Sequence, residues 1–292
     1  MKIWEKVSAV FLSGTLALTG VTGAMFAPSV FAEEGALTVW DGTANTSWYD
    51  GEETEFHIST PEELAGLAKQ IQSGKTMKGQ TFYLDSDIIL NDVSDYENWD
   101  TTAPANNWDY SVSDIKYAFA GTLKGQNHVI RGFYQNEKSG YGGLFSGIAE
   151  GGVVSDLTFE NSYVDFSQAE YSTSVGSICG NNLGTIENCQ VTGTVKNGYN
   201  RNGVVCGGIC GASSGTIQYS SFTGTLELTV NSRSSSNDYK ACIGGISGTN
   251  EELISNCAAK CTISVDDKNS SVLKRYIGGI CGEIGDAEVR SC

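Results

Sequence analysis

One short segment of the chain has the residue pattern of a serine nucleophile. Residues 211–215 read Gly-Ala-Ser-Ser-Gly, which matches the sharp strand-to-helix turn that exposes a catalytic serine. Such a serine needs a histidine as its base, and the chain has two, His57 and His128. Because similar segments elsewhere in the chain read Asn-Asn-Leu-Gly and Thr-Asn-Glu-Glu at the same place, we interpret residues 211–215 as a turn between strands.

Two further patterns resemble chemistry without completing it. Gly74, Lys75 and Thr76 copy the end of a phosphate-binding loop, but Lys69 stands where its first glycine is required. The acidic residues between 85 and 100 carry oxygen ligands that suit calcium, yet they lack the glycine and terminal glutamate of an EF-hand loop. A solvated acidic surface is the favoured interpretation. We predict no catalytic residue, no metal site and no cofactor.

A pentapeptide repeats five times between residues 142 and 282. Its copies begin at Gly142, Gly176, Gly207, Gly244 and Gly278, so that successive starts are 34, 31, 37 and 34 residues apart. A second run keeps step with it: Val154, Ile186, Ile217, Ile254 and Val289 each begin a similar tetrapeptide. Two signals with one period predict a stacked repeat protein. An earlier, shorter copy is expected at residues 119–133, and residues 82–90 are expected to form the first strand.

Each repeat is expected to contain three short strands, because apolar and polar residues alternate and glycines punctuate them. We therefore predict an all-β chain that coils as a right-handed parallel β-helix. Stacking would place Ile178, Ile209, Ile246 and Ile280 in one buried column, and the five residues that begin the second run in another. A short helix over residues 59–73, with Ser59 or Thr60 as its N-cap, is predicted to cover the N-terminal end.

Charge and hydropathy divide the rest of the chain. Residues 1–32 read as a secretory signal peptide with a Val-x-Ala cleavage site, although an uncleaved membrane anchor remains an alternative. An acidic linker over 33–55, an N-terminal cap over 56–118 and repeats over 119–292 are expected to follow, with the repeats truncated at the C-terminus. The net charge of −16 argues against nucleic acid as a partner.

The nine cysteines fall on core positions of the repeats and are odd in number. Pairing of Cys179 with Cys210 or Cys189, or of Cys257 with Cys292, is geometrically open because adjacent strands lie within the range a disulfide tolerates. Cysteine also serves as a small buried apolar residue, and serine replaces it in two repeats. We favour mostly buried thiols.

Length differences between repeats fall within residues 164–175, 196–206, 229–243 and 265–277. In a stack these segments emerge at one edge, where repeat proteins commonly bind. Tyrosine rings with neighbouring charges suit sugar or protein contact, although polar loops with incidental tyrosines are as good an interpretation. The predicted ligand-binding residues are Tyr171, Tyr199, Arg201, Arg233, Tyr239, Lys240, Arg275 and Tyr276.

The pentapeptide, followed by Gly-x-Ile-x-Asn-Cys-x-Val, resembles the GLUG repeats of bacterial surface adhesins and IgA-cleaving metallopeptidases. Residues 208–211 and 279–282 carry the resemblance best, and residues 56–65 resemble the region that precedes such repeats. The resemblance implies a secreted or surface-attached β-helical module and supplies no catalytic residue. Ser146 and Ser177 depart from the pattern by replacing glycines.

These observations predict a non-enzymatic extracellular or cell-surface module of a larger adhesin-like protein. Its expected partner is a host or environmental glycan or a surface protein, with no membrane span after signal cleavage. The alternatives are a carbohydrate-active β-helix enzyme and the repeat region of a longer metallopeptidase.

Overall fold

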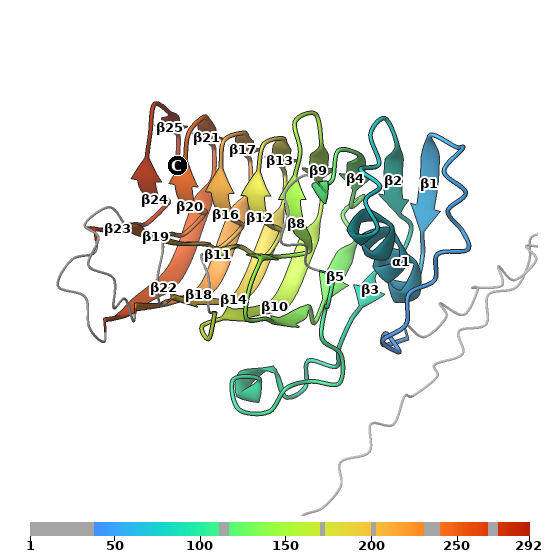
Figure 1. The fold of residues 1–292 in the computed structure, drawn as a ribbon, viewed down its shortest axis with the longest axis horizontal. Coiled ribbons are helices and arrows are strands. Elements are labelled where there is room, and N and C mark those ends of the chain that lie inside the picture. The colour runs from blue at the N-terminus through green and yellow to red at the C-terminus, as the bar shows by residue number, and fades with distance from the viewer. Residues whose placement is uncertain (1–37, 111–116, 170–172, 200–202, 231–239, 268–273) are drawn as a thin grey trace, which may run out of the picture. The chain divides into compact units, whose positions relative to one another are not determined.

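The computed structural model describes residues 38–110, 117–169, 173–199, 203–230, 240–267 and 274–292. The signal peptide and part of the linker predicted from the sequence lie outside these ranges. The described residues contain one α-helix, α1 (Pro61–Gln72), one short 3₁₀ helix, η1 (Tyr96–Asn98), and strands in four parallel sheets (Figure 1). The predicted all-β class is confirmed at this level. No helix among the described residues is long and apolar enough to cross a membrane.

Two sheets run the length of the described chain, and we number them 1 and 2. Sheet 1 contains, in order, β1 (Glu55–Ile58), β2 (Thr81–Leu84), β4 (Thr122–Lys124), β9 (Val153–Ser155), β13 (Thr185–Glu187), β17 (Thr216–Gln218), β21 (Leu253–Ser255) and β25 (Glu288–Arg290). Sheet 2 contains β3 (Ile88–Ile89), β5 (Val129–Arg131), β10 (Thr158–Phe166), β14 (Gln190–Tyr199), β18 (Ser221–Val230) and β22 (Ala258–Asp267), and β6 (Tyr134–Asn136) pairs with β10.

Two shorter sheets accompany only the repeats. Sheet 3 contains β7 (Tyr141–Gly142), β11 (Thr173–Val175), β15 (Val204–Gly207), β19 (Lys240–Gly244) and β23 (Lys274–Gly278). Sheet 4 contains β8 (Phe145–Ile148), β12 (Cys179–Asn182), β16 (Cys210–Ser213), β20 (Ser247–Asn250) and β24 (Cys281–Ile284). From residue 141 onward the chain therefore visits sheets 3, 4, 1 and 2 in turn.

Each repeat contains four strands, so the prediction of three was wrong. The run expected as one strand over 185–191 breaks at Asn188, which has a φ of 51° and separates β13 from β14. Asp156, Tyr219 and Asn256 turn the chain at the same place with φ of 54°, 51° and 52°. The residues ahead of each pentapeptide, expected as loop, pair as sheet 3, because their backbone groups bond to the equivalent segments of the neighbouring repeats.

The two predicted columns are present, and they are buried except at their last members, Ile280 and Val289, which are half-buried. Ile209 donates its backbone N–H to Ile246 at 3.0 Å, and Ile246 donates to Ile280 at 2.8 Å. In sheet 1, Ile186 stands between Val154 and Ile217. This second column continues toward the N-terminus through Leu123, Phe82 and Phe56. Parallel pairing in register thus converts sequence repetition into continuous apolar contact.

The N-terminal part differs from its prediction in one respect. The first strand was expected over 82–90, whereas β1 precedes it and the segment divides into β2 and β3. Helix α1 begins where the sequence indicated, because Thr60 accepts a hydrogen bond from the Glu63 N–H at 3.3 Å and Glu63 accepts one from the Thr60 N–H at 3.2 Å. Leu64, Leu67 and Ile71 bury the apolar face of the helix against the core.

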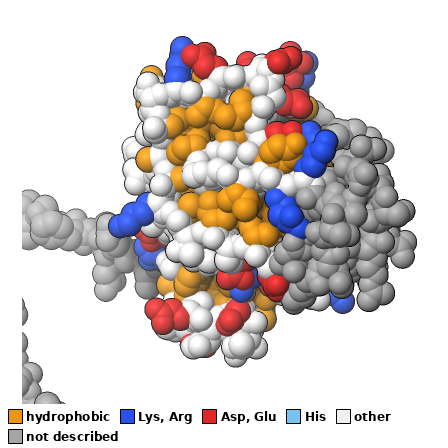
Figure 2. Space-filling model, turned by 90° about the vertical axis from the view of Figure 1, so that its left-hand side faces the viewer, with side chains coloured by type: hydrophobic (Ala, Val, Ile, Leu, Met, Phe, Trp, Pro, Cys, Tyr) orange, Lys and Arg blue, Asp and Glu red, His pale blue; other side chains and the backbone are white. Residues whose placement is uncertain are grey.

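The last described repeat leaves apolar side chains on the surface. Ile277 is 56% exposed and Ile284 is 51% exposed, whereas Ile243, the partner of Ile277 in the preceding strand, is fully buried. Figure 2 shows hydrophobic side chains in bands across this face, between polar and charged ones.

Candidate functional site

The predicted binding edge is only partly described. Tyr171, Arg201, Arg233 and Tyr239 lie outside the described residues. Tyr199 is the last residue of β14, Lys240 is the first of β19, and Arg275 and Tyr276 belong to β23. The connections between sheets 2 and 3 are shorter than the segments assigned from the sequence, because β10, β14, β18 and β22 extend into them.

The structure brings Lys240 and Tyr276 together at this edge. The Lys240 Nζ lies 5.7 Å from the centre of the Tyr276 ring and forms an ion pair with Glu283. The hydrogen bond that Lys240 donates to the Glu283 carboxylate raises the pKa of Lys240. Lys240 therefore has a carboxylate and a ring as neighbours within the protein, and sequence analysis had not assigned Glu283 to this group.

The segment that resembled a nucleophile turn has a structural role. Ser213 is the last residue of β16 and is 1% exposed. Its hydroxyl donates to the Gly215 carbonyl at 3.1 Å and accepts from the Asn182 amide at 3.2 Å. The contact with Gly215 closes the turn before β17, and the contact with Asn182 joins β16 to β12, so both bonds of the serine hydroxyl stabilise the repeat.

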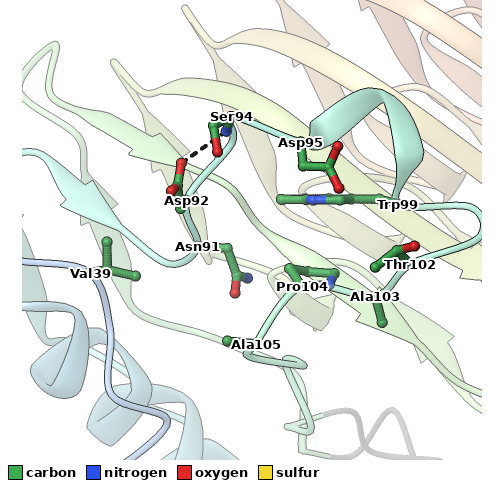
Figure 3. Close-up of a pocket in the computed structure, with 10 residues that line it drawn as sticks. All are labelled: Val39, Asn91, Asp92, Ser94, Asp95, Trp99, Thr102, Ala103, Pro104 and Ala105. Carbon is green, nitrogen blue, oxygen red and sulfur yellow. Dashed lines mark hydrogen bonds between the residues drawn. The ribbon is translucent and has the colours of Figure 1, made fainter.

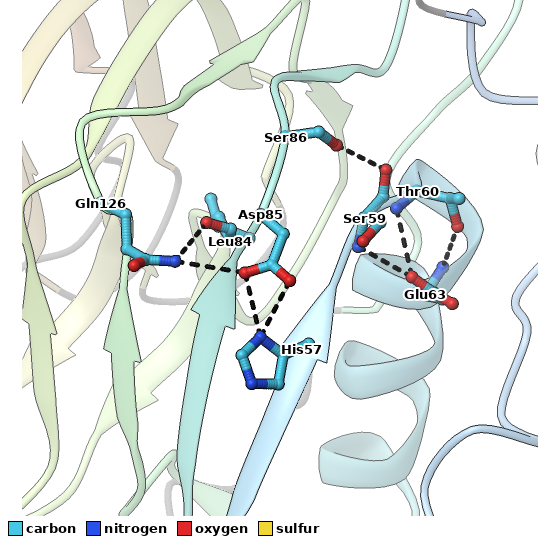
Figure 4. Close-up of polar contacts among 8 residues, drawn as sticks. All are labelled: His57, Ser59, Thr60, Glu63, Leu84, Asp85, Ser86 and Gln126. Atoms are coloured by element: carbon cyan, nitrogen blue, oxygen red, sulfur yellow. Dashed lines mark hydrogen bonds and ion pairs between the residues drawn. The ribbon is translucent and has the colours of Figure 1, made fainter. Parts of the chain in front are cut away.

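Both histidines pair with aspartates of the acidic run, and Figure 4 shows the pair of His57 with Asp85. His57 Nδ1 lies 2.8 Å from Asp85 Oδ2, and Gln126 donates to Asp85 Oδ1 at 3.2 Å. His128 Nδ1 lies 3.1 Å from Asp87 Oδ1. Ser86 donates its hydroxyl to the Ser59 carbonyl instead of to an imidazole. Within the described ranges, no three His, Cys, Asp or Glu side chains are placed to hold a metal ion.

All nine cysteines are free thiols, of which seven are buried, Cys261 is half-buried and Cys292 is exposed. Cys179 and Cys210 face each other on adjacent strands with their Sγ atoms 3.6 Å apart. Burial raises the pKa of Cys189 to about 12, and it also raises the pKa of Cys206. The thiolate is the reactive form of cysteine. These side chains are therefore protected by their burial, which blocks access, and by their raised pKa, which keeps the thiols protonated.

Thiol labelling of the native chain checks this arrangement. At pH 8 we expect Ellman's reagent to modify Cys292 rapidly and Cys261 slowly, and to reach the seven buried thiols only after unfolding. A Cys292→Ser variant should lose the fast phase and keep the rest. Rapid reaction of the buried set would contradict the burial described. Fewer than nine thiols in unfolded, unreduced protein would reveal a disulfide, with Cys179 and Cys210 as the first pair to examine.

A hollow lies between Val39 and residues 91–105 of the segment that joins β3 to β4. Its volume is about 260 Å³. Figure 3 shows the side chains around it: Val39, Asn91, Asp92, Ser94, Asp95, Trp99, Thr102, Ala103, Pro104 and Ala105. Sequence analysis missed this place, because the segment has no repeat equivalent and its aspartates had been assigned to a solvated surface.

An aromatic cluster supports one side of the hollow. Trp99 is 3% exposed and packs with Tyr134 and Tyr163 in a group separate from the main core. Its ring centre lies 5.0 Å from that of Tyr96 and 5.7 Å from that of Tyr134, both in edge-to-face geometry. Tyr96 donates its hydroxyl to the Ser162 carbonyl at 2.9 Å, which fixes the segment to β10.

Comparison with known proteins assigns a repeat motif. Residues 171–196 match the model of the GLUG motif. The chain carries a GLUG motif. The matched residues include β11, β12, β13 and most of β14, so the motif corresponds to one passage through the four sheets. No solved structure matches the chain significantly.

Two curated proteins are similar to parts of the chain. Halomucin of Haloquadratum walsbyi is 29% identical over 186 residues, which cover 62% of this chain and 2% of that protein. A putative Gly-rich membrane protein of Evansella cellulosilytica is 36% identical over 81 residues, covering 27% of this chain and 9% of that protein. The GLUG motif and these names indicate a region of a surface protein. The chain spans only these small fractions of its relatives.

Proposed function

We propose that the chain is an extracellular, non-enzymatic module that displays a binding surface on a right-handed parallel β-helix. The observation that carries the proposal is the register. Strands of four sheets pair in parallel with their equivalents one repeat away, as Ile186 does with Ile217. A chain that visits the sheets in a constant order and stacks on itself in parallel is a coil, and parallel crossovers are right-handed in nearly all proteins.

The relatives and the residues at the start of the chain support this location. Residues 1–32 have the charged start, apolar stretch and small-residue site of a secretory signal. The named relatives are a halomucin and a Gly-rich membrane protein. In a parallel stack, most strand side chains pack against the neighbouring repeats. The connections between strands are exposed and are available for recognition. Adhesion to a glycan or a surface protein is the function these features suit.

Two measurements on the whole chain distinguish a binding module from an enzyme that cleaves glycans. We expect a glycan array or a panel of surface proteins to show binding, and chromatography of the bound glycans to show no released sugar. Antibody labelling of intact cells should detect the chain without permeabilisation. Released sugar would instead support a carbohydrate-active enzyme, and signal only after permeabilisation would contradict the surface location.

The predicted edge has its own test. Replacing Tyr199, Tyr239 and Tyr276 together by alanine should weaken binding by about tenfold, because each ring offers stacking area. The ligand for this measurement is one that the glycan array or the protein panel detects. The control is Tyr219→Asn, at a tyrosine that is 60% exposed at a different corner and where Asn188 and Asn256 stand in neighbouring repeats. Unchanged binding by the triple variant would remove this edge from the ligand site.

A further inference from the structure

The hollow beside Trp99 is held open by hydrogen bonds of the protein. The Asn91 amide donates to the Asn106 carbonyl and to the Gly132 carbonyl, each at 2.9 Å, and its oxygen accepts from the Asn106 N–H at 2.9 Å. Asn91 is 2% exposed. These contacts anchor the beginning and the end of the segment that surrounds the hollow, so its shape exists before any ligand arrives.

Trp99 presents a hydrogen-bond donor without a partner. The indole N–H of Trp40 donates to the Thr43 carbonyl at 2.7 Å, that of Trp48 to the Asn45 carbonyl at 2.9 Å, and that of Trp108 to the Leu144 carbonyl at 3.3 Å. Within the described part of the chain, Trp99 Nε1 has no such acceptor, although Trp99 is only 3% exposed and lines the hollow. The indole N–H itself keeps contact with solvent at the hollow, so it can donate to a ligand or to water there.

Two carboxylates offer the complementary groups. Asp92 Oδ1 accepts the Ser94 N–H at 2.9 Å, and Asp95 Oδ1 accepts from the Asn98 amide. Among the described residues, the Oδ2 atom of neither aspartate accepts a hydrogen bond. Both side chains line the hollow beside Trp99, while the wall opposite them is apolar, formed by Ala103, Pro104 and Ala105 (Figure 3). One donor, two acceptors and a small apolar wall define the chemistry of a ligand.

We propose that this hollow binds one neutral sugar residue of a glycan. A pyranose carries hydroxyls that donate to the aspartates and oxygens that accept from the indole, and its C–H face suits the apolar wall. Acidic sugars are disfavoured, because two carboxylates line the site and the chain has a net charge of −16. The inference rests on the proposed binding function and names a site for it that is separate from the tyrosine edge.

The test is titration of the whole chain with neutral methyl pyranosides of glucose, galactose, mannose and N-acetylglucosamine, followed by saturation-transfer NMR and tryptophan fluorescence. We expect at least one to bind, and methyl glucuronide to bind about tenfold more weakly than its neutral counterpart. Trp99→Phe should weaken binding about tenfold, because it removes the N–H and retains an aromatic ring. Asp95→Asn should weaken it severalfold and leaves the aromatic cluster untouched.

Glu97→Gln is the matched control, since Glu97 lies in η1 between Asp95 and Trp99, is exposed, and does not line the hollow. It should bind as the parent does. Equal binding by Asp95→Asn and the parent, or saturation by none of the four pyranosides at tens of millimolar, would overturn this site. If antibody labelling of intact cells and binding to glycans or surface proteins persisted in that case, the proposed function would stand without this site. If both of those signals were absent, the proposed function itself would fail.

Discussion

Replacing Gly208 by alanine is expected to lower the free energy of unfolding by about 3 kcal/mol, because the packed core cannot yield space for the new methyl group. A Cβ on Gly208 would lie 2.3 Å from the Gly245 carbonyl oxygen and 2.3 Å from Cγ of Phe222. The first contact is with the backbone of the next repeat, and the second is with a fully buried ring. Chemical denaturation followed by circular dichroism measures the change.

Gly279 is the matched control for this substitution. It occupies the same position of the last described repeat, where a Cβ would meet nothing within 4 Å. Gly279→Ala should therefore change the free energy of unfolding by less than about 0.5 kcal/mol. Similar effects of the two substitutions would show that backbone entropy governs this position, and the packing explanation would fail.

Ser177 shows how one repeat accommodates a side chain at the position of Gly208. Its hydroxyl lies 2.9 Å from that of Ser162, both buried. The residue that stands level with Phe222 one repeat earlier is Val191, so the smaller side chain leaves room that Phe222 fills elsewhere. Glycine at this position is therefore required by the partner in space, and not by the repeat motif alone.

Replacing Ile217 by alanine should also lower the free energy of unfolding by about 3 kcal/mol, since a fully buried aliphatic side chain leaves a cavity when shortened. Ile217 has no exposed surface and stands between Ile186 and Ile254 in the sheet 1 column. Its neighbours are held by parallel pairing on both sides and cannot close the space. The shift of the denaturation midpoint measures the loss.

Ile284→Ala makes the same chemical change at a side chain that is 51% exposed. We expect it to cost less than about 1 kcal/mol, because half of the removed surface was already in water. A cost as large as that of Ile217→Ala would mean that the Ile284 side chain is buried in solution. That result would contradict the exposure of Ile284 in the structure.

Periodicity carried most of the fold prediction. A residue such as Ile246 recurs in phase with its neighbours, and parallel pairing then places equal residues above one another, so that columns can be assigned without coordinates. The helix start was equally readable, because Thr60 and Glu63 bond locally to each other. Such signals depend on neighbours within a few residues or on exact repetition.

The strand count could not be obtained in the same way. Asn188 interrupts a run of alternating residues only because it adopts a left-handed backbone conformation. Asparagine tolerates this conformation, but an asparagine in the sequence does not by itself predict it. Tyr219 adopts it with φ of 51° although its side chain does not favour it. Pairing with the neighbouring repeats imposes the corner at both positions.

The candidate binding places divide along the same line. Residue types alone indicated an edge with Lys240 and Tyr276, since unequal connection lengths are visible in a repeating chain. Only the folded chain shows that Glu283 forms an ion pair with Lys240, and that Trp99 and Asp95 line the same hollow. The sequence by itself determined the repeat, the parallel columns and the capped helix, because these arise from periodic and local contacts. Tertiary structure alone decided the corners, the partners of each charge and the hollow, because these depend on residues that are distant in the chain and follow no period.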